Sequence, residues 1–261
     1  MQRIGVIGGS GLYDMPGLTI TDYKKIATPF GDPSDTYIIG EFSGREVVFL
    51  PRHGSPHHIP PHKINNRANV CGFKELGVER VIAVSAVGGI SPEMRPGTIV
   101  VPDQIIDMTK GRESTFYDGD EVVHIDFTEP YCPELRESIL KAGEKSGIEL
   151  KKSGTYICVN GPRLETKAEI KFFSSIGADA VGMTAMPEAS LAREAELCFV
   201  CIAVVTNYAA GIIEKRLTTT EVVEIMGETT EKVKCLLKEA FNLIPVKRKC
   251  ACKDALKEAS M

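Results

Sequence analysis

Four loops of this chain place glycine, hydroxyl and basic residues directly after strand-like segments. Their chemistry-bearing residues are, in chain order, Ser10 within Gly8–Gly11, Arg52 and His53, Ser85 and Ala86, and Thr184. Glycine lets backbone N–H groups approach an anion, a hydroxyl adds a donor, and a guanidinium can pair with two phosphate oxygens at once. Loops at strand ends are also where α/β proteins gather their ligands. We therefore predict one phosphate-sized anion site.

Three of these loops also have a purely structural interpretation. The glycines of 8–11 fit a tight turn, Arg52 fits a surface position, and Ser85 and Ala86 fit close strand-to-loop packing. A dinucleotide fingerprint needs Gly-x-Gly-x-x-Gly, but Asp14 stands at the third glycine position, and no Gly-Lys-Ser/Thr follows. The sequence thus argues against NAD and against a nucleotide P-loop.

Four of the five histidines lie between His53 and His62, a density that resembles a metal site. Pro56, Pro60 and Pro61 prevent the helix that would stack histidines at i and i+4, and the segment contains no acidic ligand. We expect a shaped loop, with no metal and no cofactor. The nucleophile elbow and the His-Glu-x-x-His helix of hydrolases are also missing from the sequence.

Two further polar residues are candidates for recognising a ligand. Glu165 lies in Gly161-Pro-Arg-Leu-Glu-Thr166, and Asn207 ends the most apolar strand-like segment. An amide at the end of a buried strand needs a partner, which is either a ligand or a turn that it caps.

Composition and charge narrow the classes of partner. The 261 residues carry 31 Lys and Arg against 35 Asp and Glu, a net charge of −4, so no global positive field attracts nucleic acid. The longest apolar run, Leu197–Val205, is far short of the ~20 residues that span a bilayer. The N-terminus runs directly into a strand-like segment rather than a signal peptide. We expect a cytoplasmic protein without nucleic-acid or membrane partners.

Buried strands alternate with amphipathic helices along the chain. Strands are predicted at Arg3–Ile7, Tyr37–Phe42, Glu46–Leu50, Arg80–Val84, Thr98–Val101, Thr155–Val159 and Cys198–Val205. Helices are predicted at Lys63–Leu76, Glu134–Lys145, Lys167–Ile176 and Glu221–Leu243. Capping boxes are expected at Thr166 with Glu169 and at Thr218 with Glu221. The pattern indicates one α/β domain over 1–261, ending in a basic tail from about Pro245.

The eight cysteines are irregularly spaced and mostly fit small buried apolar positions. Cys250-Ala-Cys252 is the exception, because it follows Lys247-Arg-Lys249, and positive charge lowers a thiol pKa. Redox chemistry, a local disulfide and a plain tail all remain open for this pair.

Five motifs occur in order: Gly8-Gly-Ser-Gly-Leu-Tyr13, Pro51-Arg-His-Gly54, Asn65-Asn-Arg-Ala-Asn69, Gly161-Pro-Arg163 and Val181-Gly-Met-Thr-x-Met-Pro-Glu188. Together they resemble the trimeric purine nucleoside phosphorylase and methylthioadenosine phosphorylase family, from residue 4 to about 243. The resemblance implies an α/β domain with a mixed, partly barrel-like sheet flanked by helices. It also implies cleavage of a purine nucleoside by inorganic phosphate, a co-substrate, to free base and pentose 1-phosphate.

The resemblance assigns roles residue by residue. Phosphate would contact Ser10, Arg52, His53, Ser85, Ala86 and Thr184. The nucleoside would contact Met183 through its ribose and Leu164, Glu165, Asn207, Tyr208 and Ala209 around its base. Catalysis would rest on Asn207 and Glu165, through bonds that strengthen as the departing purine becomes anionic.

Donor and acceptor chemistry predicts the base. A 6-oxopurine offers N1–H to an ionised Glu165 and N7 and O6 to the Asn207 amide, whereas adenine presents an N1 lone pair to the carboxylate. Adenine-preferring members carry Asp where Asn207 stands and again two residues on, where this chain has Ala209. Leu164 replaces the Phe that many members stack on the base. We predict inosine or guanosine, with methylthioadenosine phosphorolysis as the alternative.

His124 lies in the segment that resembles the part a neighbouring subunit contributes to the 5′ end of the nucleoside. A His fits a 5′-hydroxyl or a 5′-thioether, so methylthioinosine remains open as a substrate. A shared site predicts a homo-oligomer, either a trimer or a dimer of trimers. A non-catalytic purine-binding protein and a metallohydrolase built on the His-rich loop are the remaining alternatives.

Overall fold

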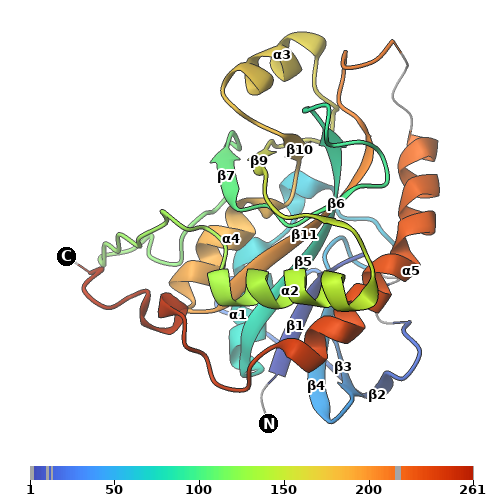
Figure 1. Ribbon diagram of the computed structural model, residues 1–261. Helices are drawn as coiled ribbons and strands as arrows, with labels where there is room; N and C mark the ends of the chain where they lie inside the picture. The colour runs from blue at the N-terminus through green and yellow to red at the C-terminus, as the bar shows by residue number, and fades with distance from the viewer. Residues whose placement is uncertain (1–2, 10–11, 13, 215–218, 261) are drawn as a thin grey trace.

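The structure is a computed structural model that describes residues 3–9, 12, 14–214 and 219–260 (Figure 1). Its mixed sheet has the path β2-β3-β4-β1-β5-β10-β9-β7, and β11, β6 and β8 branch from β5. The strands are β1 Arg3–Gly8, β2 Thr19–Lys24, β3 Tyr37–Phe42, β4 Arg45–Pro51, β5 Val78–Gly89, β6 Ile99–Val100, β7 Gln104–Asp107, β8 Leu150–Lys151, β9 Thr155–Cys158, β10 Ala180–Gly182 and β11 Cys198–Tyr208. The predicted α/β architecture with a mixed sheet flanked by helices is confirmed.

Helices cover both faces of the sheet. They are α1 Asn66–Glu75, α2 Pro133–Ser146, α3 Lys167–Ser175, α4 Ala185–Glu194 and α5 Thr219–Leu243, with short 3-10 turns η2 Pro61–Lys63 and η3 Ala251–Asp254. Apolar residues of α1 and α4 pack against one side of β5 and β11, and those of α2 and α5 pack against the other. Because alternate residues of β11 enter the two clusters, this strand is buried along almost its whole length.

The central strands run in one direction. β1 is parallel to β4 and β5, and β11 is parallel to β5. Their carboxyl ends therefore meet at one edge of the sheet, and the loops predicted to carry the anion site follow those ends. β10 is antiparallel to β5, with Val181 opposite Gly88. β10 therefore runs back along β5 from Gly89, and the loop that follows it is directed toward the carboxyl end of β1, which pairs with β5 up to Ala83.

The structure corrects the predicted start of one helix and adds four strands that were not predicted. Helix α1 begins after Asn65, whose side chain accepts from the Ala68 N–H at 3.1 Å, so the predicted start at Lys63 is three residues early. β2 and β7 went unpredicted because exposed and half-buried residues give them no apolar alternation, and β8 and β10 are too short to show a period. The capping box at Thr166 and Glu169 is confirmed, whereas Thr218 lies outside the described residues.

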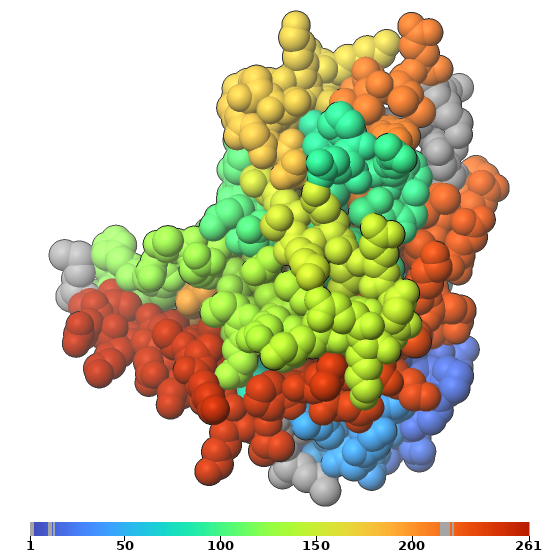
Figure 2. Space-filling view, viewed as in Figure 1, coloured from blue at the N-terminus to red at the C-terminus, as the bar shows by residue number. Residues whose placement is uncertain are grey.

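The segment after α5 packs against the body of the protein. Ile244, Cys252 and Ala259 are buried, and His124 N–H donates to the Ala259 carbonyl at 2.8 Å. Figure 2 shows this red segment along the lower edge, against the yellow-green residues around α2. Among the helices that the structure describes, none is long and apolar enough to cross a membrane.

Replacing glycine by alanine should have opposite effects on stability at two helical positions. A Cβ at Gly72 in α1 would overlap the buried ring of Tyr37, whose hydroxyl donates to the Asn69 carbonyl at 2.8 Å, whereas a Cβ at Gly227 in α5 meets open space. Gly72→Ala should lower the free energy of unfolding by ~1–3 kcal/mol, and Gly227→Ala should raise it by ~0.5–1 kcal/mol. Urea unfolding of both variants tests this, and a shift of the same sign in both would contradict the packing described.

Candidate active site

The site begins with an interruption in the pairing of the central strand. On one side of β5 the pairing with β1 ends at Ala83, and the pairing with β10 begins at Gly88. Residues 84–87 of β5 therefore pair with neither β1 nor β10. Within them Ala86 is exposed, although both its chain neighbours are buried. Backbone groups at such an interruption have no ladder partner, so they are available to other groups. A central strand therefore opens onto solvent at the carboxyl edge of the sheet.

Arg52 fills part of this interruption. Its Nη1 donates to the Val84 carbonyl at 2.7 Å, and its Nη2 donates to the Ile7 carbonyl at 3.3 Å. Nε and Nη2 donate to the two carboxylate oxygens of Glu188 at 2.5 and 3.1 Å. Both side chains are almost fully buried. Burial lowers the pKa of Arg52, but the charge of Glu188 and its hydrogen bond outweigh burial and raise that pKa above its usual value.

This geometry changes the expected role of Arg52. The sequence predicted a fork that grips two phosphate oxygens, but Glu188 occupies the Nε and Nη2 side of that fork. Four of the five guanidinium N–H groups are engaged by the bonds above, which leaves one N–H of Nη1. Arg52 can thus give a ligand one hydrogen bond and a positive field, and Glu188 holds the guanidinium in place.

His53 follows Arg52 and is neutral at physiological pH. Burial, followed by the positive charge of Arg52, lowers its pKa to about 4, although the hydrogen bond to the Ile59 carbonyl opposes this shift in part. Nδ1 lies 2.8 Å from the Ile59 carbonyl oxygen, which can only accept, so Nδ1 carries the proton. The His53 ring also stacks on His57, with centroids 4.1 Å apart. Nε2 is then an acceptor, suited to a hydroxyl or a protonated phosphate oxygen.

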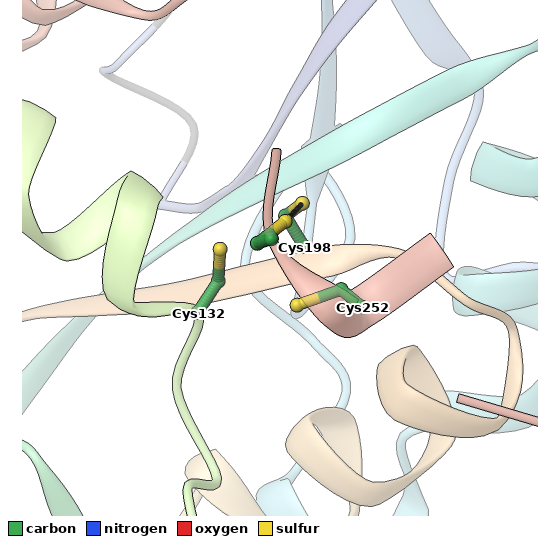
Figure 3. A group of neighbouring side chains, drawn as sticks. Cys132, Cys198 and Cys252 are labelled. Carbon is green, nitrogen blue, oxygen red and sulfur yellow. Dashed lines mark hydrogen bonds between the residues drawn. The ribbon is translucent and has the colours of Figure 1, made fainter. Parts of the chain in front are cut away.

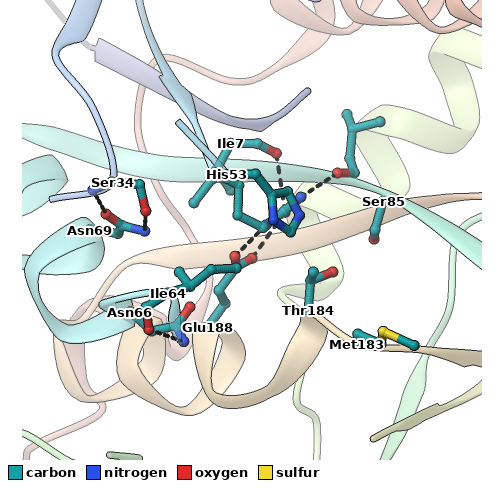
Figure 4. Close-up of polar contacts among 12 residues, drawn as sticks. Ile7, Ser34, His53, Ile64, Asn66, Asn69, Ser85, Met183, Thr184 and Glu188 are labelled. Atoms are coloured by element: carbon teal, nitrogen blue, oxygen red, sulfur yellow. Dashed lines mark hydrogen bonds and ion pairs between the residues drawn. The ribbon is translucent and has the colours of Figure 1, made fainter. Parts of the chain in front are cut away.

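Two hydroxyls belong to this region, Ser85 on the interrupted segment of β5 and Thr184 in the loop that follows β10. Ser85 is buried in β5 with its Oγ 3.2 Å from Cys201 Sγ, and Thr184 stands at the N-cap of α4 (Figure 4). Thr184 Oγ1 is buried and has no hydrogen-bond partner among the described residues. A buried hydroxyl without a partner is costly unless a ligand supplies one. Ser10, the remaining predicted phosphate residue, lies outside the described residues.

Met183 is held by the loop that carries Glu165. A Cβ at Gly161 would overlap Met183 Sδ, and Gly161 has φ +62°, so glycine is required there for both reasons. Arg112 fixes the same two loops, because its guanidinium donates to the carbonyls of Met183, Met186 and Asn160 at 2.6 to 2.9 Å. The sequence gave no signal for Arg112, which lies in an irregular loop without a motif.

Glu165 stands two residues before α3 and is half-buried. Burial raises the pKa of this carboxyl, with a smaller rise from the negative charge of Glu169. Leu164 beside it is 47% exposed, so it presents an apolar surface rather than a core contact. Because burial disfavours the ionised form of this carboxyl, a ligand that donates a hydrogen bond to it would stabilise the carboxylate.

Asn207 is buried near the end of β11, opposite Gly88. Its Oδ1 accepts from the Thr206 hydroxyl at 2.9 Å, and its Nδ2 donates to the Tyr208 carbonyl at 2.9 Å. These two bonds fix the amide and leave one N–H and one lone pair for a ligand. Tyr208 follows it half-buried, and Ala209 is buried among residues of α3 and β9.

The predicted base residues share one end of the molecule. Ala209 packs in a small apolar cluster with Ile170 and Phe173 of α3, and a Cβ at Gly211 would meet the side chain of Lys167 at 2.8 Å. The loop after β11 therefore lies against the start of α3, next to Glu165. His124 is not part of this assembly, because it is exposed in a loop bound to the C-terminal segment.

The Arg52 pair predicts a distinctive pattern of stability. Arg52→Ala should lower the free energy of unfolding by ~3–5 kcal/mol, because it leaves the Glu188 carboxylate buried without a counter-charge. Arg52→Met combined with Glu188→Leu should recover most of that loss, since an apolar pair needs no compensation. The exposed pair of Arg163 with Glu169 provides the control, Arg163→Ala, for which we expect a smaller loss. Denaturant unfolding measures all three, and equal losses for the two alanine variants would contradict a buried pair.

Comparisons with known proteins agree with the motifs. The chain matches the Phosphorylase superfamily over residues 3–242. It is 51% identical to the 6-oxopurine nucleoside phosphorylase of Pyrococcus furiosus, with all of both chains covered. It is 54% identical to the probable S-methyl-5′-thioinosine phosphorylase of Thermodesulfovibrio yellowstonii, covering 99% of this chain and 97% of the relative. It is also 53% identical to the S-methyl-5′-thioadenosine phosphorylase of Thermofilum pendens, covering 98% of each.

The fold agrees with solved structures as well. A methylthioadenosine phosphorylase from an antarctic soil metagenomic library superposes with a TM-score of 0.94 at 37% identity, covering 100% of this chain and 92% of that one. This chain and that structure thus share one fold over the full length of the chain. The chain belongs to the phosphorylase superfamily.

Proposed function

We propose that this protein cleaves the N-glycosidic bond of 6-oxopurine nucleosides with inorganic phosphate, giving free base and ribose or deoxyribose 1-phosphate in purine salvage. Inosine and guanosine are the proposed substrates, with 5′-methylthioinosine as a further one. The observation that carries the proposal is the interruption of β5. There Ala86 is exposed, Arg52 donates to the Val84 carbonyl, and the Thr184 hydroxyl has no hydrogen-bond partner in the part of the chain that the structure describes. The full-length relatives with purine nucleoside phosphorylase names support it.

We propose that the phosphate subsite combines one positive charge with several hydrogen-bond donors. Arg52 supplies positive charge, while the Thr184 and Ser85 hydroxyls and the backbone of Ala86 supply hydrogen bonds. His53 accepts from a protonated phosphate oxygen or a ribose hydroxyl through Nε2. Ser10 is proposed to complete this set by its place in the Gly8–Gly11 motif. No metal or cofactor is proposed for the reaction.

The proposed reaction is a displacement at C1′ of the sugar. A phosphate oxygen forms a bond to C1′ while the C1′–N9 bond breaks, and the electron pair of that bond moves onto the purine. The transition state has positive charge on the sugar and negative charge on the base. The phosphate dianion stabilises the first, and the free N–H of Asn207 stabilises the second by donating to N7. Met183 is proposed to pack on the ribose between the two.

Glu165 is proposed to select the base through its charge. An ionised carboxylate accepts from N1–H of a 6-oxopurine, and that donor stabilises a charge that burial otherwise disfavours. Adenine offers N1 only as an acceptor, so it leaves the carboxylate unpaired. Asn207 and Ala209 stand where adenine-preferring members carry Asp, which supports the same choice. Leu164 and Tyr208 are proposed to flank the base.

Methylthioadenosine phosphorolysis is the second candidate, because a relative of that name shares 53% identity over nearly the whole chain. It requires Glu165 to bind adenine in its protonated form, and the raised pKa of this carboxyl lowers the cost of that state. The two candidates share the phosphate subsite and the displacement, and they differ in the proton on Glu165.

We further propose a homo-oligomer, a trimer or a dimer of trimers. Exposed apolar side chains gather on α3 and the neighbouring loops, namely Leu164, Phe172, Ile176, Ile212 and Ile213. His124 is exposed on a different part of the surface, as a residue offered to a neighbouring subunit would be. A cytoplasmic location is proposed, and the eight free thiols suit a reducing compartment.

Phosphate dependence and base choice can be measured together. We expect cleavage of inosine only when phosphate is present, with kcat/KM roughly 10²- to 10⁴-fold above that for methylthioadenosine and adenosine. Purified protein, each nucleoside, and reactions with and without phosphate suffice. Thr184→Val, purified in parallel, controls for host phosphorylases and should raise the KM for phosphate more than that for inosine. If methylthioadenosine leads, the second candidate replaces the first, and cleavage of neither nucleoside would contradict both.

The protonation of Glu165 predicts a pH-dependent preference. As the pH falls toward the raised pKa of Glu165, the protonated carboxyl can donate to adenine N1, so the inosine-to-adenosine ratio of kcat/KM should fall. Taking the ratio cancels the ionisation of phosphate, which both reactions share. Glu165→Gln, which has no titrating proton, should show a lower ratio that is independent of pH. A wild-type ratio that stays constant with pH would move base selection to another residue.

A further inference from the structure

Cys201 supplies the hydrogen-bond partner of the Ser85 hydroxyl. Cys201 Sγ lies 3.2 Å from Ser85 Oγ, and both side chains are buried. Among the described residues, Ser85 Oγ makes no other hydrogen bond. Cys201 is a free thiol within the apolar segment Leu197–Val205, so the sequence marked it only as a core residue. The contact bears on function because Ser85 belongs to the proposed phosphate subsite.

The pairing of β5 with β11 brings the thiol and the hydroxyl together. The two strands are parallel, with Cys201 opposite Ala83 and Ala203 opposite Ser85. Cys201 and Ala203 belong to one apolar cluster with residues of α4, so this face of β11 is directed toward the helix whose N-cap is Thr184. Because the side chain of Ala203 is short, the thiol can reach Ser85 from two positions earlier on the neighbouring strand.

A phosphate dianion needs Ser85 as a hydrogen-bond donor. The serine hydroxyl has one proton, which it can give either to Cys201 or to a ligand, and the ionised oxygens of a dianion can only accept. If Ser85 donated to the thiol, the lone pairs of its oxygen would face the anion and repel it. If the thiol donates to Ser85 Oγ instead, the serine proton is free for the anion.

The Cys201 thiol keeps its proton at physiological pH and can therefore donate it. Burial raises the pKa of this thiol to about 12, although its hydrogen bond with Ser85 and the positive charge of Arg52 lower the pKa in part. An ionised phosphate oxygen is also a stronger acceptor than a thiol sulfur, which is a weak one. Phosphate binding therefore favours the arrangement in which the thiol donates to the serine and the serine donates to the anion.

We propose that Cys201 is a positioning residue of the phosphate subsite, which donates its S–H to Ser85 Oγ and thereby directs the serine proton toward the anion. The inference rests on the proposed function, in which inorganic phosphate is that anion. Thr184 differs from Ser85, because its Oγ1 has no hydrogen-bond partner among the described residues. The thiol should therefore act on phosphate through Ser85 alone. Asn207 stands six residues further along β11, about 20 Å away at the rise of a strand, so recognition of the base should not change.

Steady-state kinetics of two variants at Cys201 test the proposal on the full chain. Cys201→Ala should raise the KM for phosphate about 3- to 10-fold, the order expected for one hydrogen bond, while the KM for inosine stays within about twofold. Cys201→Ser keeps a donor and should stay within about twofold of the wild type for both substrates. Val200→Ala is the matched control, because Val200 is equally buried but belongs to the cluster on the other face of β11, and it should leave both KM values unchanged.

A double-mutant cycle separates positioning from packing. In a Ser85→Ala background, Cys201→Ala should cause no further rise in the KM for phosphate, because the thiol has no hydroxyl left to direct. A thiol that only fills space would instead give the same rise in both backgrounds. Equal rises, or an unchanged KM in Cys201→Ala itself, would overturn the proposal.

Infrared spectroscopy with inorganic phosphate reports on the thiol directly. The S–H stretching band that Cys201→Ser removes from the spectrum belongs to Cys201, and a thiol that donates a hydrogen bond absorbs at lower frequency than a free one. In the phosphate-bound wild type this band should lie at the low frequency of a donor, and Ser85→Ala should move it to the higher frequency of a free thiol. The measurement remains decisive should Cys201→Ala fail to fold, and a wild-type band at the free frequency would contradict the proposal.

Binding of inorganic phosphate alone distinguishes this inference from the proposed function. Calorimetric titration of the wild type and of Cys201→Ala should give Kd values that differ about 3- to 10-fold. If phosphate binds with this dependence on Cys201 but no nucleoside is cleaved, the proposed function fails and the role of Cys201 stands. If the wild type cleaves inosine with phosphate and Cys201→Ala does so with the same KM values, the role of Cys201 fails alone. A wild-type chain that neither binds nor uses phosphate would overturn both.

Discussion

The ion pair between Arg52 and Glu188 joins the two halves of the proposed phosphate subsite. Arg52 comes from the end of β4, and Glu188 comes from α4, so a single pair of charges ties the sheet to the helix that carries Thr184 at its N-cap. A guanidinium in the interior is tolerable only when it is paired and hydrogen-bonded. Glu188 meets this need from one side, and the carbonyls of Val84 and Ile7 meet it from the other. The ion pair that compensates the buried charge of Arg52 therefore also fixes the two sides of the subsite relative to each other.

The remaining geometry follows from close approaches that only certain residues allow. Gly161 admits Met183 against the loop that carries Glu165, and Arg112 ties the backbone of that loop to the residues after β10. The amide of Asn207 is fixed by Thr206 and Tyr208 before any ligand arrives. A displacement with little covalent chemistry of its own depends on such preorganisation, since donors already in place need no rearrangement in the transition state. The polar groups proposed for the site come from the end of β4, from β5, from the N-cap of α4 and from β11.

The sequence predicted the architecture because the architecture follows from local patterns, and the same patterns selected the loops that carry the candidate site residues. Continuous Val and Ile runs marked β1, β5 and β11, and small or basic residues after them marked the loops. The role of Arg52 was beyond such patterns, because Glu188 lies 136 residues away and only the fold brings it into reach. Arg112 and the interruption of β5 are likewise products of long-range pairing. Exposed strands such as β2 left no apolar period to detect.

The two ends of β11 meet different parts of the molecule. At its first residue the strand meets α2 and the C-terminal segment, and toward its last residues it presents Asn207 beside Gly88. Between these points the strand is buried on both faces and pairs in register with β5, so it is a rigid spacer rather than a hinge. At the first end the thiols of Cys132, Cys198, Cys250 and Cys252 lie within 4.8 Å of one another, so the strand packs there against two segments that are distant in the sequence (Figure 3). The other end of the strand lies beside features that cost stability locally, an exposed Ala86 and a Thr184 hydroxyl without a hydrogen-bond partner among the described residues. The burial of the strand on both faces offsets that cost.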